Sequence, residues 1–329
     1  MNATSSSLPQ ATPAGAPGHP AGDDETTIDA TRRIPPHGER ALVLGGGGSS
    51  GNAWLIGVLA GLADAGLDVT QADLTIGTSA GATAAAQLVG ATPAELYAAI
   101  LAATPPQRPA SAGPTGGPRP AANHMERLTG IIASATDPAD MRRRLGAATL
   151  EADAPSDGSG SAKWRATVAA RFPAHEWPER TILLTAVDAE SGQPTVFDRH
   201  SGVDLVDAVA ASTSNGFGVG PYGIGGHRYL DGGYRRNENA DLAAGYRRVL
   251  VLSPLGGRTL TPLEWGQQLA VQADELRAAG SEVETVLPDA ESLEAFGDNM
   301  MDLTRRVPAA QAGYRQGQGI AGRVAELWR

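Results

Sequence analysis

The feature that restricts the fold most is a repeated unit: a short apolar run, a glycine-rich turn and a helix. Residues 41–44 lead into four consecutive glycines, and a helix is predicted over 52–65. Residues 73–76 lead into a second such turn, with a predicted helix over 82–89. Small residues recur every four positions along the first helix, which favours close packing on a sheet: Ala53, Gly57, Gly61 and Ala65. This order predicts an α/β fold with a parallel sheet and right-handed crossovers.

The rest of the chain adds further predicted elements. The predicted strands are 181–187, 194–197, 228–230, 248–252 and 282–287. The predicted helices are 204–211, one that starts at Thr261-Pro262, 290–306 and 309–328. Two stretches, 103–120 and 151–162, are predicted as flexible segments, and the first of them as a lid.

Composition divides the chain into three regions. Residues 1–37 carry few large apolar side chains and are predicted to be a disordered tail. A single folded domain is expected over 38–308, followed by a C-terminal helix over 309–329. The formal net charge of −10 argues against nucleic acid as a partner, and membrane contact is expected to be weak or transient.

Other sequence features limit the chemistry and the compartment. The chain has no cysteine, and its 6 histidines have no metal-ligand spacing, so no metal or organic cofactor is expected. It shows neither a signal-peptide pattern nor an apolar run of transmembrane length, which favours the cytoplasm and leaves export without a signal open. The oligomeric state is left open.

The first glycine motif, Gly45-Gly46-Gly47-Gly48-Ser49-Ser50-Gly51, has two functional interpretations. It matches the G-x-G-x-x-G pattern that binds dinucleotides between a strand and a helix. The acidic residue of that pattern is not clear, because Asp68 and Asp73 come before or at the start of the next strand. Alternatively, consecutive backbone N–H groups at a helix N-terminus form a loop that holds an oxyanion. The motif alone leaves both open, together with a plain turn that binds nothing.

The second and third motifs favour acyl-transfer chemistry. Gly77-Thr78-Ser79-Ala80-Gly81 has the G-x-S-x-G pattern of a nucleophile elbow, which presents a serine at the end of a strand. Asp231-Gly232-Gly233 follows a predicted strand, and its two glycines leave the carboxylate uncrowded. A structural turn is the alternative for Asp231, because Asp-Gly is common in turns.

The histidines do not complete a three-residue serine hydrolase site. Such a site in an α/β hydrolase has a His after its acid, and this chain has none beyond His227. His200 follows the predicted hairpin, and His227 lies next to two glycines in a turn. A two-residue site of Ser79 and Asp231 therefore fits the sequence better than a triad.

Together, the three motifs resemble those of the patatin-like phospholipase family: G-G-G-x-R/K-G after a strand, then G-x-S-x-G, then D-G-G or D-G-A. The resemblance covers about residues 40–255 and extends to 207–212, Asn237 and 241–243. It implies a three-layer α/β/α fold with a mainly parallel central sheet. It also implies hydrolysis of lipid acyl esters, with a lipid or fatty-acyl ester as the substrate.

The resemblance assigns roles to particular residues. It makes Ser79 the nucleophile and Asp231 the base. The oxyanion is then held by backbone N–H groups of Gly46, Gly47 and Gly48, and the turns are supported by Gly51, Gly77, Gly81, Gly232 and Gly233. Three positions depart from the family pattern: Ser50 replaces Arg or Lys, and Gly216 and Asn239 each replace a proline.

The sequence thus predicts a serine acyl hydrolase of the lipase or phospholipase A type. Two other functions are kept as alternatives. One is a catalytically weak or inactive lipid-binding or scaffold protein on the same fold, which the departures at positions 50 and 216 favour. The other, less favoured, is a nucleotide binder of the Rossmann type.

Overall fold

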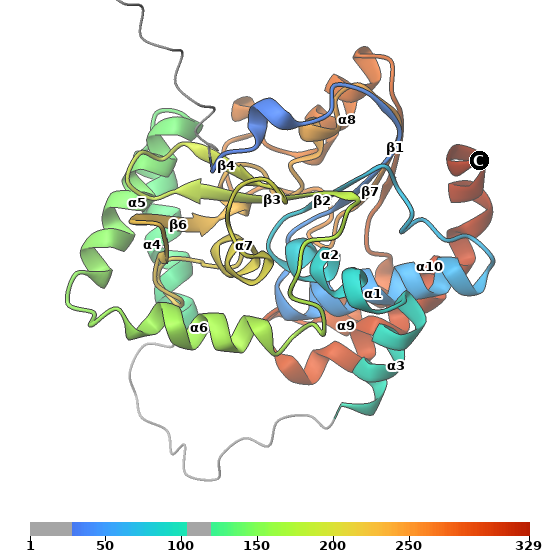
Figure 1. Cartoon of the computed structure of the whole chain (residues 1–329), viewed down its shortest axis with the longest axis horizontal. Coiled ribbons are helices and arrows are strands. Elements are labelled where there is room, and N and C mark those ends of the chain that lie inside the picture. The colour runs from blue at the N-terminus through green and yellow to red at the C-terminus, as the bar shows by residue number, and fades with distance from the viewer. Residues whose placement is uncertain (1–27, 104–119) are drawn as a thin grey trace, which may run out of the picture.

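A mixed eight-stranded sheet forms the centre of the protein, in a computed structural model that describes residues 28–103 and 120–329 (Figure 1). Its strands are β1 (Gly38–Leu44), β2 (Leu74–Gly77), β3 (Thr181–Asp188), β4 (Pro194–Phe197), β5 (Tyr222–Ile224), β6 (His227–Asp231), β7 (Tyr246–Leu252) and β8 (Glu282–Val286). Their order is β5-β6-β3-β2-β1-β7-β8, and β4 pairs with β3. Strands β3, β2, β1, β7 and β8 run parallel, whereas β4, β5 and β6 pair antiparallel. The predicted α/β class is confirmed.

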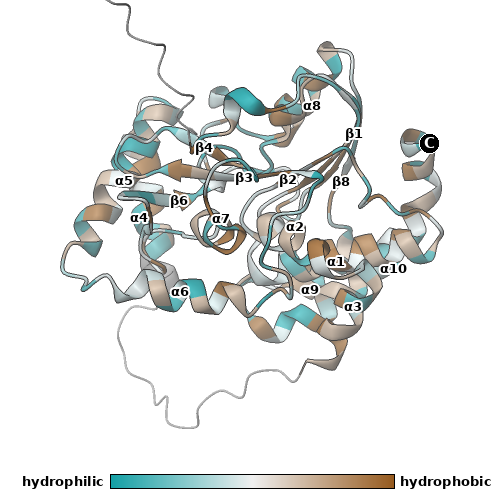
Figure 2. Ribbon diagram, in the orientation of Figure 1, coloured by the Kyte–Doolittle hydropathy of each residue, from teal (hydrophilic) through white to brown (hydrophobic). Residues whose placement is uncertain are grey.

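Helices cover both faces of this sheet (Figure 1). They are α1 (Gly48–Asp64), α2 (Ala80–Gly90), α3 (Pro93–Ala102), α4 (Pro120–Ser134), α5 (Pro138–Asp153), α6 (Ser159–Ala169), α7 (Leu205–Ser212), α8 (Leu269–Ala278), α9 (Ala290–Phe296) and α10 (Arg306–Trp328). In β1, Leu42 and Leu44 join the core cluster under α1, while Ala41 and Val43 join the one under α8. Figure 2 shows the hydrophobic strands between the two layers of helices. The alternation of a β-strand thus builds the three layers.

Helices α1 and α10 pack closely because both carry glycines at their contact. A Cβ atom on Gly57 would lie 2.2 Å from the Ala310 carbonyl oxygen, and one on Gly61 would lie 2.1 Å from that of Tyr314. The predicted small-residue ridge of α1 therefore exists, but its two glycines face α10 rather than the sheet. The Trp54 indole adds a hydrogen bond of 3.0 Å to Gln316 Oε1.

Ten residues of the predicted tail pack against the domain. Residues 1–27 of the predicted tail lie outside the described residues, but residues 28–37 pack beside β4. Ala30 is fully buried, and its N–H donates to the Val196 carbonyl at 2.7 Å. Arg33 forms an ion pair with Asp198 at 2.9 Å. Residues 28–37 therefore pack with the domain that is predicted over 38–308.

Several helices differ from the prediction. The predicted helix start at Thr261-Pro262 yields only a 3-10 turn, Leu263–Trp265, and α8 begins later. The predicted flexible segment 151–162 holds the end of α5 and the start of α6. Helices α3 to α6 were not predicted, although Thr92 and Glu95 form a capping box at the start of α3. The predicted lid, 103–120, lies almost wholly outside the described residues.

Candidate active site

The glycine loop and the nucleophile elbow meet because their strands are neighbours in the sheet. Strands β1 and β2 run parallel, with Leu44 opposite Gly77, so the turns that follow them leave the same edge. A Cβ atom on Gly46 would lie 3.7 Å from the Ser79 Cβ. Strand β6 runs antiparallel to β3 and ends there at Asp231. The topology thus brings all three sequence motifs to one place.

Ser79 occupies a strained backbone conformation between β2 and α2. Its φ of 54° and ψ of −110° are unusual for any residue with a side chain, at a cost of about 1–3 kcal/mol. Its N–H donates to Ser212 Oγ at 3.0 Å, which helps to hold the turn. Gly81 has no room for a side chain, because a Cβ would lie 1.8 Å from the Leu44 carbonyl oxygen. The elbow is therefore built by close packing against the end of β1.

Asp231 is the acidic group beside Ser79. The Gly233 N–H donates to Asp231 Oδ1 at 2.8 Å. Desolvation raises the pKa of Asp231 to about 6, although the Ser79 hydroxyl and the Gly233 N–H act on that pKa in the opposite direction. At neutral pH this carboxylate is ionised and more basic than an ordinary aspartate, so it can accept a proton from a neighbouring hydroxyl.

The glycine loop offers fewer free donors than the sequence predicts. The Gly46 N–H already donates to the Asn237 carbonyl at 2.8 Å, so Gly46 is not an available oxyanion donor. Within residues 28–103 and 120–329, the N–H groups of Gly47 and Gly48 have no acceptor. Both lie at the start of α1, where the helix dipole favours negative charge. The sequence pattern could not reveal this difference, because the Asn237 carbonyl comes from a distant segment.

The histidines and carboxylates of the chain offer little else near this site. No histidine in the described part of the chain hydrogen-bonds to Ser79 or Asp231. His227 Nδ1 lies 3.4 Å from Asp188 Oδ2. Together with Glu190, these residues offer three possible metal-ligand atoms that all lie within 4.8 Å of one another. Asp188 also accepts hydrogen bonds from Ser191, and Glu190 and His227 are exposed. These contacts are those of surface turn residues.

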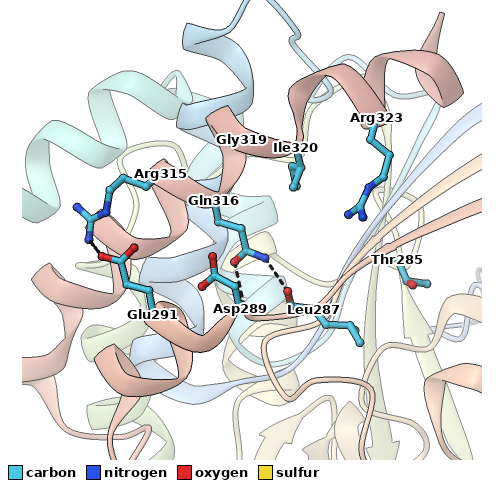
Figure 3. Close-up of a pocket in the computed structure, with 9 residues that line it drawn as sticks. All are labelled: Thr285, Leu287, Asp289, Glu291, Arg315, Gln316, Gly319, Ile320 and Arg323. Atoms are coloured by element: carbon cyan, nitrogen blue, oxygen red, sulfur yellow. Dashed lines mark hydrogen bonds and ion pairs between the residues drawn. The ribbon is translucent and has the colours of Figure 1, made fainter.

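A cavity of about 560 Å³ lies elsewhere, between β8, α9 and α10 (Figure 3). Several of its polar side chains have partners: Arg315 pairs with Glu291, and Gln316 donates to the Leu287 carbonyl at 2.6 Å. None of the site residues predicted from the sequence lines it. The cavity is therefore separate from the candidate active site.

A comparison with protein-family models agrees with this arrangement. The model of the patatin-like phospholipase family matches residues 42–244, which hold all three motifs. The chain belongs to this family. Patatin-like phospholipases are lipid acyl hydrolases, and membership supports that general activity and a lipid substrate for this chain.

Two solved structures resemble this patatin-like phospholipase. VipD from Legionella pneumophila has 13% sequence identity and a TM-score of 0.40, over 88% of this chain and 67% of VipD. The type III effector protein ExoU has 15% identity and a TM-score of 0.31, over 86% of this chain and 54% of ExoU. No curated protein sequence matches significantly.

No single helix among the described residues is long and apolar enough to cross a membrane. Helices α2 and α3, which are bent by 111° relative to each other, together have the length and apolar composition of a broken membrane span, and only those two properties support it.

Two of the departures from the family pattern have a structural account. Gly216 has a φ of 86°, which proline cannot adopt, so the segment around it follows a path that a proline would forbid. Asn239 has a φ of 55° and is fully buried. Its Nδ2 lies 3.0 Å from Thr78 Oγ1, 3.2 Å from the Gly232 carbonyl and 3.2 Å from Thr185 Oγ1. Asn239 therefore joins the turn that carries Ser79 to the turn that carries Asp231, a role that sequence reasoning missed.

Replacing Asn239 should destabilise the protein and reduce its activity together. The Asn239→Ala variant loses the amide contacts and puts alanine in a left-handed conformation that asparagine adopts more readily, so it should lose about 3 kcal/mol of unfolding free energy. Asn239→Gly loses the same amide but tolerates the backbone, and should lose less. Urea unfolding and ester hydrolysis measure both effects. Equal losses for the two variants would contradict a backbone contribution, and wild-type activity in both would contradict the bridging role.

Proposed function

We propose that this patatin-like phospholipase is a serine acyl hydrolase that works through a dyad of Ser79 and Asp231. The observation that carries the proposal is that the strained turn of Ser79 and the turn of Asp231 are joined by the Asn239 amide at one sheet edge, where the Ser79 hydroxyl lowers the pKa of Asp231. The Ser79 side chain is partly exposed, so a substrate can reach it. A serine hydroxyl is a weak nucleophile until a neighbouring base accepts its proton.

The proposed reaction has two halves. Ser79 Oγ attacks the ester carbonyl carbon while its proton moves to Asp231. The tetrahedral intermediate then collapses, the alcohol leaves with the proton from Asp231, and an acyl-Ser79 ester remains. A water molecule attacks this ester and gives a proton to Asp231. The carboxylic acid leaves, and the proton returns to Ser79 Oγ.

The negative charge of each tetrahedral intermediate needs donors near its oxygen. We assign this role to the free N–H groups of Gly47 and Gly48 rather than to Gly46, whose N–H is engaged with Asn237. Loss of one such donor typically costs about 3–4 kcal/mol of transition-state stabilisation. The N–H of Ala80, at the start of α2, is a further candidate donor.

The acyl chain of the substrate needs an apolar surface near this dyad. Tyr234 lies three residues after Asp231, and its hydroxyl donates to the Asn215 carbonyl at 2.7 Å. With Phe217 and Trp265 it packs, partly exposed, against the apolar cluster of α4 and α5. We propose that this aromatic edge binds the acyl chain, which agrees with a lipid ester as substrate.

Covalent labelling as a function of pH tests this function. A fluorophosphonate probe should label the wild-type protein at Ser79. Mass spectrometry of the labelled peptide identifies the labelled residue. The base must be deprotonated to act, so the labelling rate should be highest above the Asp231 pKa of about 6. Below that pH it should fall about tenfold per pH unit. No labelling at any pH favours a lipid-binding or scaffold protein, and labelling that does not vary between pH 5 and 8 contradicts Asp231 as the base.

A further inference from the structure

The glycine loop of this chain lacks a basic side chain of its own. Position 50, which is Arg or Lys in the family pattern, is a fully buried serine whose Oγ has no hydrogen-bond partner. The Ser50 N–H donates to the Met300 carbonyl at 2.9 Å. The start of α1 is therefore held by the segment that precedes α10, and not by a cation of the loop.

Arg306 brings a positive charge to the same place from the other end of the sequence. It is the first residue of α10, and its Nη1 donates to the Ser49 carbonyl at 3.0 Å and to Asn52 Oδ1 at 3.2 Å. No carboxylate in residues 28–103 or 120–329 forms an ion pair with it. Burial lowers the pKa of Arg306, as does the charge of Arg171, and arginine stays protonated in proteins. The guanidinium is thus partly desolvated and bound only to neutral groups at the first turn of α1.

The contacts of Asn52 extend this arrangement to the nucleophile. Asn52 Nδ2 donates to Gln87 Oε1 at 3.0 Å and lies 3.4 Å from the Ala80 carbonyl. Ala80 follows Ser79 directly, and Ser49 follows Gly48. Arg306 is therefore connected to both turns that have to be aligned for acyl transfer. Through the Asn52 side chain it is connected to Ala80 in the nucleophile elbow, and through the Ser49 carbonyl to the glycine loop.

We propose that Arg306 is a positioning residue that replaces the basic side chain missing at position 50. It holds the Ser49 carbonyl and Asn52, and so fixes the direction in which the Gly47 and Gly48 N–H groups point. Its charge also adds to the positive potential at the start of α1, where the intermediate carries negative charge. This role rests on the proposed function. It makes α10, which lies beyond the family match at residues 42–244, a part of the active site.

The Arg306→Ala variant tests this role by chemical rescue. On a neutral p-nitrophenyl ester we expect kcat to fall about 100-fold with little change in KM, because a misaligned site loses transition-state stabilisation. Added guanidinium ions should restore part of the lost kcat, and urea at the same low concentration should not. Arg306→Lys should retain more activity than Arg306→Ala, since it keeps the charge. Arg305→Ala, at the exposed neighbouring position, serves as the matched control.

Each other outcome has a definite meaning. Unchanged kcat in Arg306→Ala overturns the proposal, as does a loss that neither guanidinium nor lysine restores. A loss confined to KM makes Arg306 a substrate-binding residue and also overturns it. Hydrogen exchange of the wild type and Arg306→Ala keeps the test independent of turnover, because the amides of residues 47–52 should exchange faster in the variant. If the wild type is inactive but this exchange difference is present, the proposed function fails while the positioning role stands. Equal exchange in both proteins overturns the positioning role.

Discussion

Replacing Ser79 with alanine is expected to reduce ester hydrolysis by at least about four orders of magnitude, because no other group then attacks the carbonyl. The fold should survive, since the variant removes one partly exposed hydroxyl and keeps the Cβ in the same backbone conformation. The free energy of unfolding should change by about 1 kcal/mol or less, the usual worth of one hydrogen bond. Initial rates on a p-nitrophenyl acyl ester and thermal unfolding measure the two quantities.

An exposed serine outside the candidate active site serves as the control for this variant. Ser134 lies exposed at the end of α4, and Ser134→Ala should keep wild-type turnover. Fluorophosphonate labelling should disappear in Ser79→Ala and persist in Ser134→Ala. Wild-type turnover in Ser79→Ala would falsify the nucleophile assignment.

Replacing Asp231 with asparagine should remove activity and stabilise the protein at the same time. Without a carboxylate no base accepts the Ser79 proton, so turnover should fall by about two to four orders of magnitude. The folded-state pKa of Asp231 is raised from 3.8 to about 6, so the ionised carboxylate opposes folding. Asparagine carries no charge and can still accept from the Gly233 N–H, so the variant should melt at a higher temperature than the wild type at pH 8.

The pH dependence of this stabilisation has a definite sign. Between about pH 4 and 6 the folded wild type binds the Asp231 proton more tightly than the unfolded chain does, so the penalty disappears as the pH falls. The stability gained by Asp231→Asn should therefore be full above pH 6 and absent below pH 4.

His200→Ala and His227→Ala should keep most of the wild-type activity. A histidine variant as inactive as Asp231→Asn contradicts the dyad and indicates a triad.

The parts of the site that the sequence predicts are those that depend on local backbone geometry. Gly77 and Gly81 are identifiable because a sharp turn after a strand needs residues without side chains, and parallel strands bring such turns to one edge. Asn239 and Arg306 were not identifiable, because their roles depend on contacts with residues far away in the sequence. The engagement of the Gly46 N–H was missed for the same reason. Helix α6 carries small or polar residues among its apolar ones, and the apolar periodicity of such a segment is weak.

The contact between α1 and α10 has a consequence for how the protein is made. Gly57 and Gly61 of α1 fit against α10, whose first residue is Arg306, so α1 lacks its partner until α10 has been synthesised. At about 5–20 residues per second, roughly 10–50 s separate the translation of the two helices. In the last part of this interval, once residue 233 has been added, the nascent chain carries all three motifs. A chain that stops before residue 306 has every motif and lacks the surface that α1 needs.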